Sequence, residues 1–374
     1  MKVLTVLGTR PEIIRLGRVI AVLDQHASHV LVHTGQNFDD RLDGLFFREL
    51  GIRAPDVHMA VRGASFADQI GQILTKIEPV LLEHRPDRLL ILGDTNSGLT
   101  AIVARRLGIP VFHMEAGNRC YDDRVPEEVN RRIIDHCSSV LMPYTEGSRR
   151  NLLREGFAEE RIYVTGNPIK QMLDCFASHI EASTVLTALG LEERSFFLVT
   201  MHRAENVDVP ERLRSLVEAL AAAHRTYGMP VVCSLHPRTR AKMEQFGVDA
   251  KDVGVRYVEP LGFFDFVRLE KSAFCLLSDS GTAQEEACIL KTPAVTLRDV
   301  TERPETIECG SNILAGSDPA TILRCIAQVT RGGTSWEPPR EYLAPQVAET
   351  VARIVLGYQL PSRAEEAWRA GTRR

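Results

Sequence analysis

The stretch Val3-Leu4-Thr5-Val6-Leu7-Gly8-Thr9-Arg10-Pro11-Glu12-Ile13-Ile14-Arg15 decides the fold class of this chain. Its first five residues are apolar or β-branched without strict alternation, a pattern typical of a strand buried on both faces of a parallel sheet. Gly8 permits a tight turn and Pro11 suits the first turn of a helix, so the stretch predicts a strand that leads directly into a helix. Backbone N–H groups at this helix start, with Arg10 and Arg15, suit a phosphate-sized anion, while a plain turn with solvated arginines is an open alternative.

The same alternation of short apolar runs and longer amphipathic stretches continues along the chain. In the stretch 211–220, for example, apolar residues stand three and four apart, which is the spacing of a helix. The predicted strands fall into two sets of six, at 3–8, 30–35, 89–93, 111–115, 140–144 and 162–166, and at 196–201, 231–236, 255–258, 274–278, 294–297 and 312–314. Repeated strand–helix units predict an α/β protein with two doubly wound, Rossmann-like domains. Because ligands bind at the carboxyl ends of parallel strands, we expect the site in a cleft that the two domains face.

The gap between the two sets of strands predicts the domain boundaries. The stretch 171–193 contains no strand pattern and is the expected connection. We therefore expect an N-terminal Rossmann-like domain over 1–170, a C-terminal Rossmann-like domain over 171–355 and a C-terminal tail over 356–374. The charged residues from Pro361 onward predict a surface helix with frayed ends.

The composition excludes several classes of protein. A chain of 374 residues exceeds the roughly 250–300 at which single cores stop growing. Hydrophobic residues at 44% and charged residues at 25% exclude global disorder, and the net charge of −4 argues against nucleic acid or a membrane surface as a partner. Eight cysteines without a C-x-x-C motif predict reduced thiols. The apolar N-terminal stretch is too short for the core of a signal peptide, so we expect a cytoplasmic protein.

Three carboxylates of the first half follow predicted strands and are candidate acid–base groups. Asp94 and Glu115 come directly after two successive strands, and Glu127 follows a few residues later. Like charges that gather at one rim raise one another's pKa, and carboxylates tuned in this way serve as general acids and bases. The alternatives are a helix N-cap for Asp94 and a favourable first-turn charge for Glu127.

The second half offers groups that suit a phosphate and a proton transfer. His202 ends a predicted strand and suits either a diphosphate contact or a proton shuttle, although a lone histidine is more often structural. The segment Ser278-Asp279-Ser280-Gly281-Thr282 opens a helix with hydroxyl and N–H groups for phosphate, or else forms a capping box. Glu286 lies one turn further on and suits sugar hydroxyls, and Arg303 follows a later strand. The segment His236-Pro237-Arg238 either contacts the substrate or only forms the turn after its strand.

Several motifs of other enzyme classes do not occur. The sequence has no G-x-G-x-x-G, P-loop, H-E-x-x-H or G-x-S-x-G motif and no His/Cys cluster with metal-ligand spacing. A dinucleotide cofactor, a catalytic metal and a serine nucleophile therefore have no support. Arginines, helix starts that suit phosphate and several carboxylates together favour an enzyme that acts on a nucleotide-sugar.

Seven short motifs, in order, carry a resemblance to a known family. They are Gly-Thr-Arg-Pro-Glu at 8–12, Gly-Asp-Thr at 93–95, Glu-Ala-Gly at 115–117, Pro-Glu-Glu at 126–128 with Asn130-Arg131, His-Arg at 202–203 with Glu205-Asn206, Asp-Ser-Gly at 279–281 with Gln284-Glu285-Glu286, and Thr-Glu-Arg-Pro-Glu at 301–305. Over about residues 1–358, the chain resembles the non-hydrolysing UDP-N-acetylglucosamine 2-epimerases. The resemblance implies the two-domain glycosyltransferase-B architecture, a homodimer, and no metal or other cofactor.

The resemblance also implies a reaction and roles for residues. These enzymes eliminate UDP across C1–C2 of a UDP-2-acetamido sugar and add it back with the proton on the other face. That chemistry needs a base, an acid and cations beside the departing diphosphate. By matching position, the catalytic residues are Asp94, Glu115, Glu127 and His202. The UDP and substrate contacts are Arg10, Arg15, Arg131, Ser280, Gly281, Thr282, Glu286 and Arg303, with Glu286 on the ribose hydroxyls.

Departures from the usual family pattern are similar to one branch in particular. Arg15 stands where lysine is usual, Thr282 replaces the second glycine of Ser-Gly-Gly, and Asn37 replaces the histidine of Thr-Gly-Gln-His. Members of this branch convert UDP-2-acetamido-2,6-dideoxy-L-talose to UDP-N-acetyl-L-fucosamine, a precursor of capsule or O-antigen polysaccharide. The alternatives are a UDP-N-acetylglucosamine 2-epimerase that forms UDP-N-acetylmannosamine, a hydrolysing variant, a glycosyltransferase of the same architecture, and a non-catalytic sensor of nucleotide-sugars.

Overall fold

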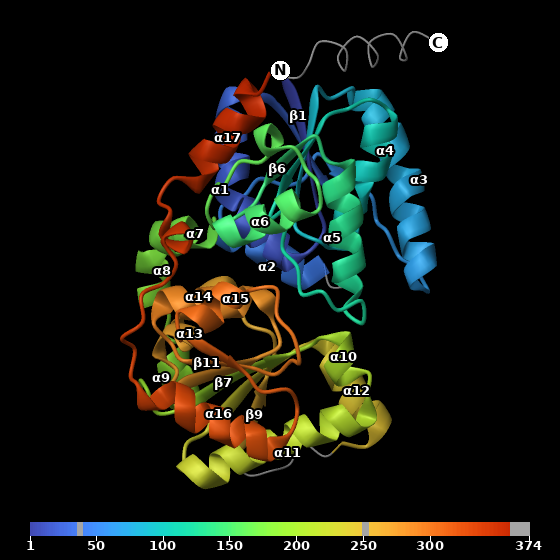
Figure 1. The fold of residues 1–374 in the computed structure, drawn as a ribbon. Coiled ribbons are helices and arrows are strands. Elements are labelled where there is room, and N and C mark those ends of the chain that lie inside the picture. The colour runs from blue at the N-terminus through green and yellow to red at the C-terminus, as the bar shows by residue number, and fades with distance from the viewer. Residues whose placement is uncertain (36–39, 249–253, 360–374) are drawn as a thin grey trace. The chain divides into compact units, whose positions relative to one another are not determined.

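The computed structural model describes residues 1–35, 40–248 and 254–359, and the chain forms two compact units (Figure 1). Unit 1 consists of Met1–Met172 together with the described residues from Ala344 onward, and unit 2 consists of Leu173–Leu343. Each unit contains one six-stranded sheet in which all neighbouring strands are parallel. The predicted α/β class with two doubly wound domains is confirmed.

The sheet of unit 1 has the strand order β3-β2-β1-β4-β5-β6. Its strands are β1 (Lys2–Leu7), β2 (Ser28–His33), β3 (Val57–His58), β4 (Arg88–Leu92), β5 (Val111–Met114) and β6 (Val140–Met142). Its helices are α1 (Arg10–His26), α2 (Asp40–Glu49), α3 (Phe66–His84), η1 (Asn96–Leu99), α4 (Thr100–Arg106), α5 (Pro126–Cys137), α6 (Glu146–Arg154), η2 (Glu159–Arg161) and α17 (Val347–Gly357), and α7 (Ile169–Cys175) leads into unit 2.

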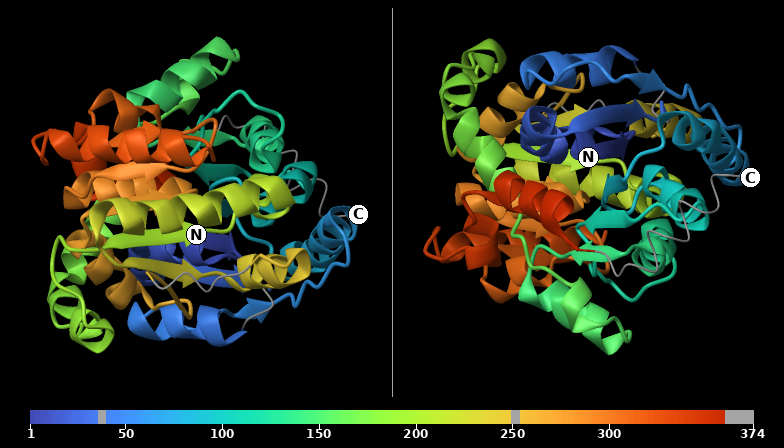
Figure 2. Two further views of the ribbon diagram at one scale, coloured as in Figure 1. Left: turned by 90° about the horizontal axis from the view of Figure 1, so that it is seen from below. Right: turned by 90° about the horizontal axis from the view of Figure 1, so that it is seen from above.

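Helices cover both faces of the unit 1 sheet (Figures 1 and 2). One core cluster joins Leu4 and Ile91 of the strands to Ile77 of α3 and to residues of α4 and α5. Helices α1 and α17 pack against each other, and both bury apolar side chains. A strand buried on both faces needs no alternation of polar residues, which explains the continuous apolar runs of the sequence.

The sheet of unit 2 has the order β12-β11-β10-β7-β8-β9. Its strands are β7 (Phe197–Met201), β8 (Val231–Leu235), β9 (Val255–Val258), β10 (Cys275–Ser278), β11 (Ala294–Thr296) and β12 (Asn312–Leu314). Its helices are α8 (Ala177–Glu181), α9 (Val185–Leu189), α10 (Ala204–Val207), α11 (Pro210–Tyr227), α12 (Pro237–Phe246), α13 (Phe263–Ser272), α14 (Gly281–Leu290), α15 (Pro304–Glu308), α16 (Pro319–Arg331) and η3 (Arg340–Leu343).

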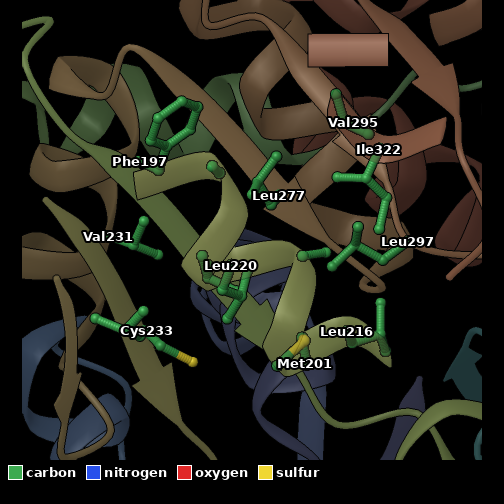
Figure 3. Packing of buried hydrophobic residues seen from close by; sticks show 14 of the residues in the cluster. Phe197, Met201, Leu216, Leu220, Val231, Cys233, Leu277, Val295, Leu297 and Ile322 are labelled. Carbon is green, nitrogen blue, oxygen red and sulfur yellow. The ribbon is translucent and has the colours of Figure 1, made fainter. Parts of the chain in front are cut away.

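Two hydrophobic clusters lie on opposite faces of the unit 2 sheet. Figure 3 shows the larger, in which Leu216 and Leu220 of α11 and Ile322 of α16 pack onto strand residues such as Leu277. The second cluster joins the alternate strand residues, Leu276 among them, to α9, α13 and α14. Successive residues of a strand point to opposite faces, so each strand contributes to both clusters.

Three details differ from the sequence-based expectation. The stretch 162–166 is not a strand; it contributes only an isolated bridge between Ile162 and Leu141. The two-residue strand β3 was not predicted, because so short a run carries no periodic signal. Residues 344–355, expected in the second domain, belong to unit 1. The predicted surface helix of the tail lies outside the described residues from position 360 onward.

Hydrogen bonds explain why the chain returns to unit 1 after residue 343. The Arg88 side chain donates to the backbone carbonyls of Val355 and, at 2.6 Å, Tyr358. The amide of Gln171 donates to Glu349 at 2.8 Å. An amphipathic pattern shows that α17 buries one face but does not show which sheet it covers. Within the described part of the chain, no helix has the length and apolarity that crossing a membrane requires.

Candidate active-site groups in the two units

Asp94 lies just beyond the carboxyl end of β4 and is held by α5. Its Oδ2 accepts hydrogen bonds from Nη2 and Nε of Arg131 at 2.5 and 3.1 Å, and its backbone carbonyl accepts one from the Asn130 amide at 3.0 Å. The Asp94 side chain is 19% exposed, whereas that of Arg131 is 2% exposed. The N-cap of the following 3-10 helix is Thr95, so Asp94 does not serve as the helix cap that we considered as an alternative. A positive charge fixed beside a reachable carboxylate favours its ionised form.

Glu115 follows β5, the strand next to β4, and its backbone is in the left-handed region with φ of 66°. A non-glycine residue in this region is strained, and strained residues of this kind cluster at active sites. Its carboxylate accepts from Arg15 Nη1 at 2.5 Å and from the Asn118 amide at 3.3 Å. Arg15 is buried, and its guanidinium also lies 5.7 Å from the centre of the Tyr144 ring. Two carboxylates at the ends of neighbouring strands are thus each paired with a buried arginine.

These contacts give two of the predicted substrate-binding arginines partners that the sequence did not indicate. Arg15 and Arg131 were expected to contact UDP or the substrate, and the structure places both guanidinium groups against the candidate carboxylates. Arg10 begins α1, is partly exposed, and has its guanidinium 6.0 Å from the centre of the Phe46 ring. Arg10 is thus partly exposed, whereas Arg15 of the same helix is buried.

The two glutamates at the start of α5 differ in burial. Glu127 is half-buried, in the first turn of the helix. Glu128 is fully buried and accepts hydrogen bonds from the backbone of Cys120 and Tyr121 and from Arg131. Burial opposes ionisation of Glu128, but the Cys120 N–H and the charge of Arg131 lower its pKa below the usual value. Glu128 thereby fixes the loop before α5, a role that the sequence did not indicate.

A buried network lies behind both carboxylates of unit 1. His113 of β5 contacts Asp135 at 2.8 Å through Nδ1 and the carbonyl oxygen of Gly93 at 2.9 Å through Nε2. Asp135 also accepts from Arg119 at 2.7 Å and from the Gly117 amide at 3.2 Å. Gly93 and Gly117 flank the two candidate carboxylates in the sequence, so this network fixes the backbone around them. Sequence reasoning missed it because its members are far apart along the chain.

In unit 2, His202 follows β7 and is oriented by Asp279. Its Nδ1 lies 3.3 Å from Asp279 Oδ1, and its side chain is 37% exposed. The buried Asp279 carboxylate also accepts from the backbone amides of His202 and Arg203 at 3.0 Å and from the Asn206 amide at 3.1 Å. A partly exposed histidine with a buried carboxylate beside one ring nitrogen suits proton transfer or anion contact better than core packing. The sequence allows His236 either a substrate contact or a turn; its ring centre lies 5.7 Å from that of His202, and it caps α12.

The start of α14 carries the predicted phosphate-binding segment. Ser280 is the N-cap, but its hydroxyl does not cap the helix; it lies 3.0 Å from the Thr282 hydroxyl instead. The capping-box alternative is therefore not what the structure shows. A Cβ at Gly281 would lie 2.6 Å from a carboxylate oxygen of Glu302, so a larger residue here would require the Glu302 side chain to move.

Two acidic residues further along α14 have different partners. Glu285 pairs with Arg303 at 2.5 Å, and both side chains are almost fully buried, so Arg303 is engaged inside unit 2. Glu286 lies beside Glu270 of α13. Burial raises the pKa of Glu270 well above its usual value, and the neighbouring charge of Glu286 raises it further.

The described residues contain no group of three or more His, Cys, Asp or Glu side chains arranged to hold a metal ion. The arrangement provides instead paired carboxylates in unit 1 and, in unit 2, a histidine and a helix start that suit an anion. Such groups can move a proton at carbon and accept a departing phosphate.

The model of the UDP-N-acetylglucosamine 2-epimerase family matches residues 21–356. The chain belongs to this family. It is 39% identical to the UDP-N-acetylglucosamine 2-epimerase of Methanococcus maripaludis, a match that covers 96% of this chain and all of the relative. It is 36% identical to the UDP-2,3-diacetamido-2,3-dideoxy-D-glucuronate 2-epimerase of Pseudomonas aeruginosa, over 95% of this chain and 99% of the relative.

A solved structure agrees with the sequence matches. The Methanocaldococcus jannaschii UDP-GlcNAc 2-epimerase, in complex with UDP-GlcNAc and UDP, superimposes with a TM-score of 0.91 at 38% identity and covers 95% of this chain and 99% of its own. The family resemblance of the sequence motifs and the glycosyltransferase-B-like fold are confirmed. The chain is accordingly an isomerase, a UDP-sugar 2-epimerase.

Proposed function

We propose that this epimerase inverts C2 of a UDP-2-acetamido sugar by eliminating UDP and adding it back. One observation carries the proposal: Asp94 and Glu115 follow neighbouring strands, and each is paired with a buried arginine. A base takes the C2 proton while the C1–O bond breaks and its electron pair leaves with the diphosphate, which gives a 2-acetamidoglycal. Re-addition forms the C1–O bond again as an acid delivers a proton to the other face of C2. No electron acceptor or metal is needed for this balance.

The roles proposed for individual residues follow the chemistry of each unit. Asp94, Glu115 and Glu127 of unit 1 act as acids and bases at C2, and His202 of unit 2 acts on the departing diphosphate. The remaining contacts to UDP and substrate are proposed for Arg10, Arg15, Arg131, Ser280, Gly281, Thr282, Glu286 and Arg303. Of these, Arg15 and Arg131 also hold the carboxylates of Glu115 and Asp94, and Arg303 also pairs with Glu285.

For the physiological substrate we propose UDP-2-acetamido-2,6-dideoxy-L-talose, which gives UDP-N-acetyl-L-fucosamine for capsule or O-antigen. The support is the pattern of departures at Arg15 and Thr282. The alternative is UDP-N-acetylglucosamine, the substrate named for the Methanococcus relative. Incubation of the purified protein with each sugar nucleotide, followed by NMR, distinguishes them, since only the true substrate reaches equilibrium with its C2 epimer. A homodimer and a cytoplasmic location remain predictions.

Turnover in D2O should place deuterium at C2 of the product, because the proton removed in the elimination exchanges with solvent before re-addition. The measurement is NMR or mass spectrometry of the nucleotide-sugar, with no acceptor sugar present. Product without deuterium contradicts the mechanism. Stoichiometric free UDP indicates a hydrolysing enzyme, a requirement for an acceptor indicates a glycosyltransferase, and binding without conversion indicates a sensor.

Replacement Arg10→Ala should weaken UDP binding roughly 10–100-fold, since a hydrogen bond to a charged group contributes about 1.5–3 kcal/mol. Isothermal titration with UDP measures the effect. Arg53→Ala is the matched control, because Arg53 is another arginine of unit 1 that pairs with Asp24 and Asp56 and is remote from Arg10 in the sequence. Equal affinity of the Arg10→Ala protein and the wild type would exclude Arg10 from the UDP site.

A further inference from the structure

Glu12 is a buried carboxylate that the proposed acid–base chemistry does not use. It lies in the first turn of α1 and is 1% exposed. A glutamate in the first turn of a helix is ordinarily a favourable negative charge at the positive end of the helix dipole. A charge at that position needs no burial, so the complete enclosure of Glu12 calls for another explanation.

The carboxylate of Glu12 joins two separate turns of the chain. Its Oε2 accepts from the Gly8 amide at 2.9 Å and from the Thr9 hydroxyl at 2.8 Å, which belong to the turn between β1 and α1. Its Oε1 accepts from the Thr95 hydroxyl at 2.9 Å, and Ser97 Oγ lies 3.4 Å from Oε2; both belong to the segment after β4. Four donors from two segments therefore converge on one side chain.

These two turns carry groups to which the proposed reaction assigns roles. The first turn leads directly into Arg10, and the second contains Asp94, the residue before Thr95. Strands β1 and β4 are neighbours in the sheet, so both turns leave the same edge. On its other side Asp94 is held by Arg131 and Asn130 of α5. Asp94 is thus fixed from α5 directly and from α1 through Thr95 and Glu12.

We propose that Glu12 is a positioning residue, which fixes the turn that carries Asp94 relative to the turn that carries Arg10. This inference rests on the proposed role of Asp94 in proton transfer. A base misplaced by about 1 Å loses much of its rate advantage, so a residue that fixes the Asp94 turn affects turnover without contacting the substrate.

The protonation state of Glu12 matters for this link. Burial raises the pKa of Glu12 to about 7, although the hydrogen bonds from Thr9, Thr95 and Gly8 favour the ionised form. The ionised carboxylate accepts every bond, whereas the protonated acid must donate one, and a hydroxyl such as that of Thr95 must then turn to accept it. The charged groups on the adjoining segments are Arg10 and Arg15 of α1 and Asp94 of the second turn, with Arg131 of α5 behind Asp94.

The link is tested with Glu12→Gln, Thr95→Val and the double variant. Thr95→Val should lower kcat roughly tenfold with the Kd of UDP within twofold of wild type, because it releases only the Asp94 turn. Glu12→Gln should lower kcat to a similar extent and also weaken UDP binding severalfold, because it releases both turns. The double variant should have the kcat of Glu12→Gln alone, since both changes break one link. Thr95→Ser should restore kcat, and Glu12→Gln should remove an ionisation near pH 7 from the pH profile of kcat.

Thr5→Val is the matched control, because Thr5 is a fully buried threonine of β1 whose hydroxyl bonds His29 at 2.8 Å. It should lower the melting temperature but not the kcat of folded protein. Losses in kcat that multiply in the double variant, or an equal loss in Thr5→Val, would overturn the positioning role. If Glu12→Gln does not fold, Thr95→Val and Thr95→Ser still decide the matter through kcat. Failure of the proposed function itself shows differently, as wild-type protein that exchanges no deuterium.

Discussion

Asp94→Asn should lower the turnover of the epimerase by about 1,000-fold, because general acid–base groups contribute about 100–10,000-fold to rate and an amide cannot take the C2 proton. Asparagine keeps the shape of the side chain and an oxygen that can accept from Arg131, so the fold and the affinity for UDP should change little. The experiment compares kcat, deuterium incorporation at C2 and the calorimetric Kd of UDP in the two proteins.

Asp56→Asn is the control for the loss of an arginine-paired aspartate. Asp56 accepts from Arg53 at 2.8 Å and stands before β3, outside the proposed catalytic machinery. This variant should retain the wild-type kcat. A fully active Asp94→Asn enzyme would remove Asp94 from the mechanism, and its arginine pair would then be structural.

Arg15→Met should destabilise unit 1 by about 3–5 kcal/mol, since removal of one partner of a buried ion pair leaves the other charge uncompensated. Arg15 and Glu115 are both buried, and the remaining carboxylate would sit on a strained backbone. For a unit of this size the change corresponds to a melting temperature lower by roughly 10 °C. Thermal unfolding followed by circular dichroism measures it, and turnover should fall as Glu115 loses its orientation.

Two further variants separate charge from packing at this pair. Arg15→Lys keeps the positive charge and should retain most of the stability. The double variant Arg15→Met, Glu115→Gln removes both charges and should recover much of the loss, although it will be inactive. If Arg15→Met melts at the wild-type temperature, the pair contributes nothing to stability, and its part in orienting Glu115 must be judged from turnover alone.

The sequence predicted the strands, and the candidate functional residues at their carboxyl ends, because both depend on local patterns. Continuous apolar runs identified all the strands of both sheets except β3, and the one false strand, 162–166, has the same composition but pairs only at Ile162. A run of β-branched residues indicates that a segment is buried; only the neighbouring backbone decides whether its hydrogen bonds extend into a ladder.

The assignment of charged partners could not be predicted in the same way. The sequence placed Asp94, Glu115 and His202 after strands, and the structure confirms those positions. It gave no means of finding Asp279 behind His202 or Glu270 beside Glu286, because these pairs are formed by elements that the sheet and helix packing bring together. Asp279 belongs to the Asp-Ser-Gly motif at 279–281. It follows β10, which lies next to β7 in the sheet, so a prediction of the strand order would indicate that Asp279 lies near His202.

Local patterns were enough to identify a two-unit α/β epimerase, because hydrophobic periodicity, turn residues and ordered motifs are properties of short segments. The partners of its charged groups become known only from the folded chain. Arg15 and Glu115 are 100 positions apart, yet the guanidinium of Arg15 meets the Glu115 carboxylate at the end of another strand. The physical reason is that a buried charge requires a compensating partner, and which partner lies within reach depends on the packing of distant elements.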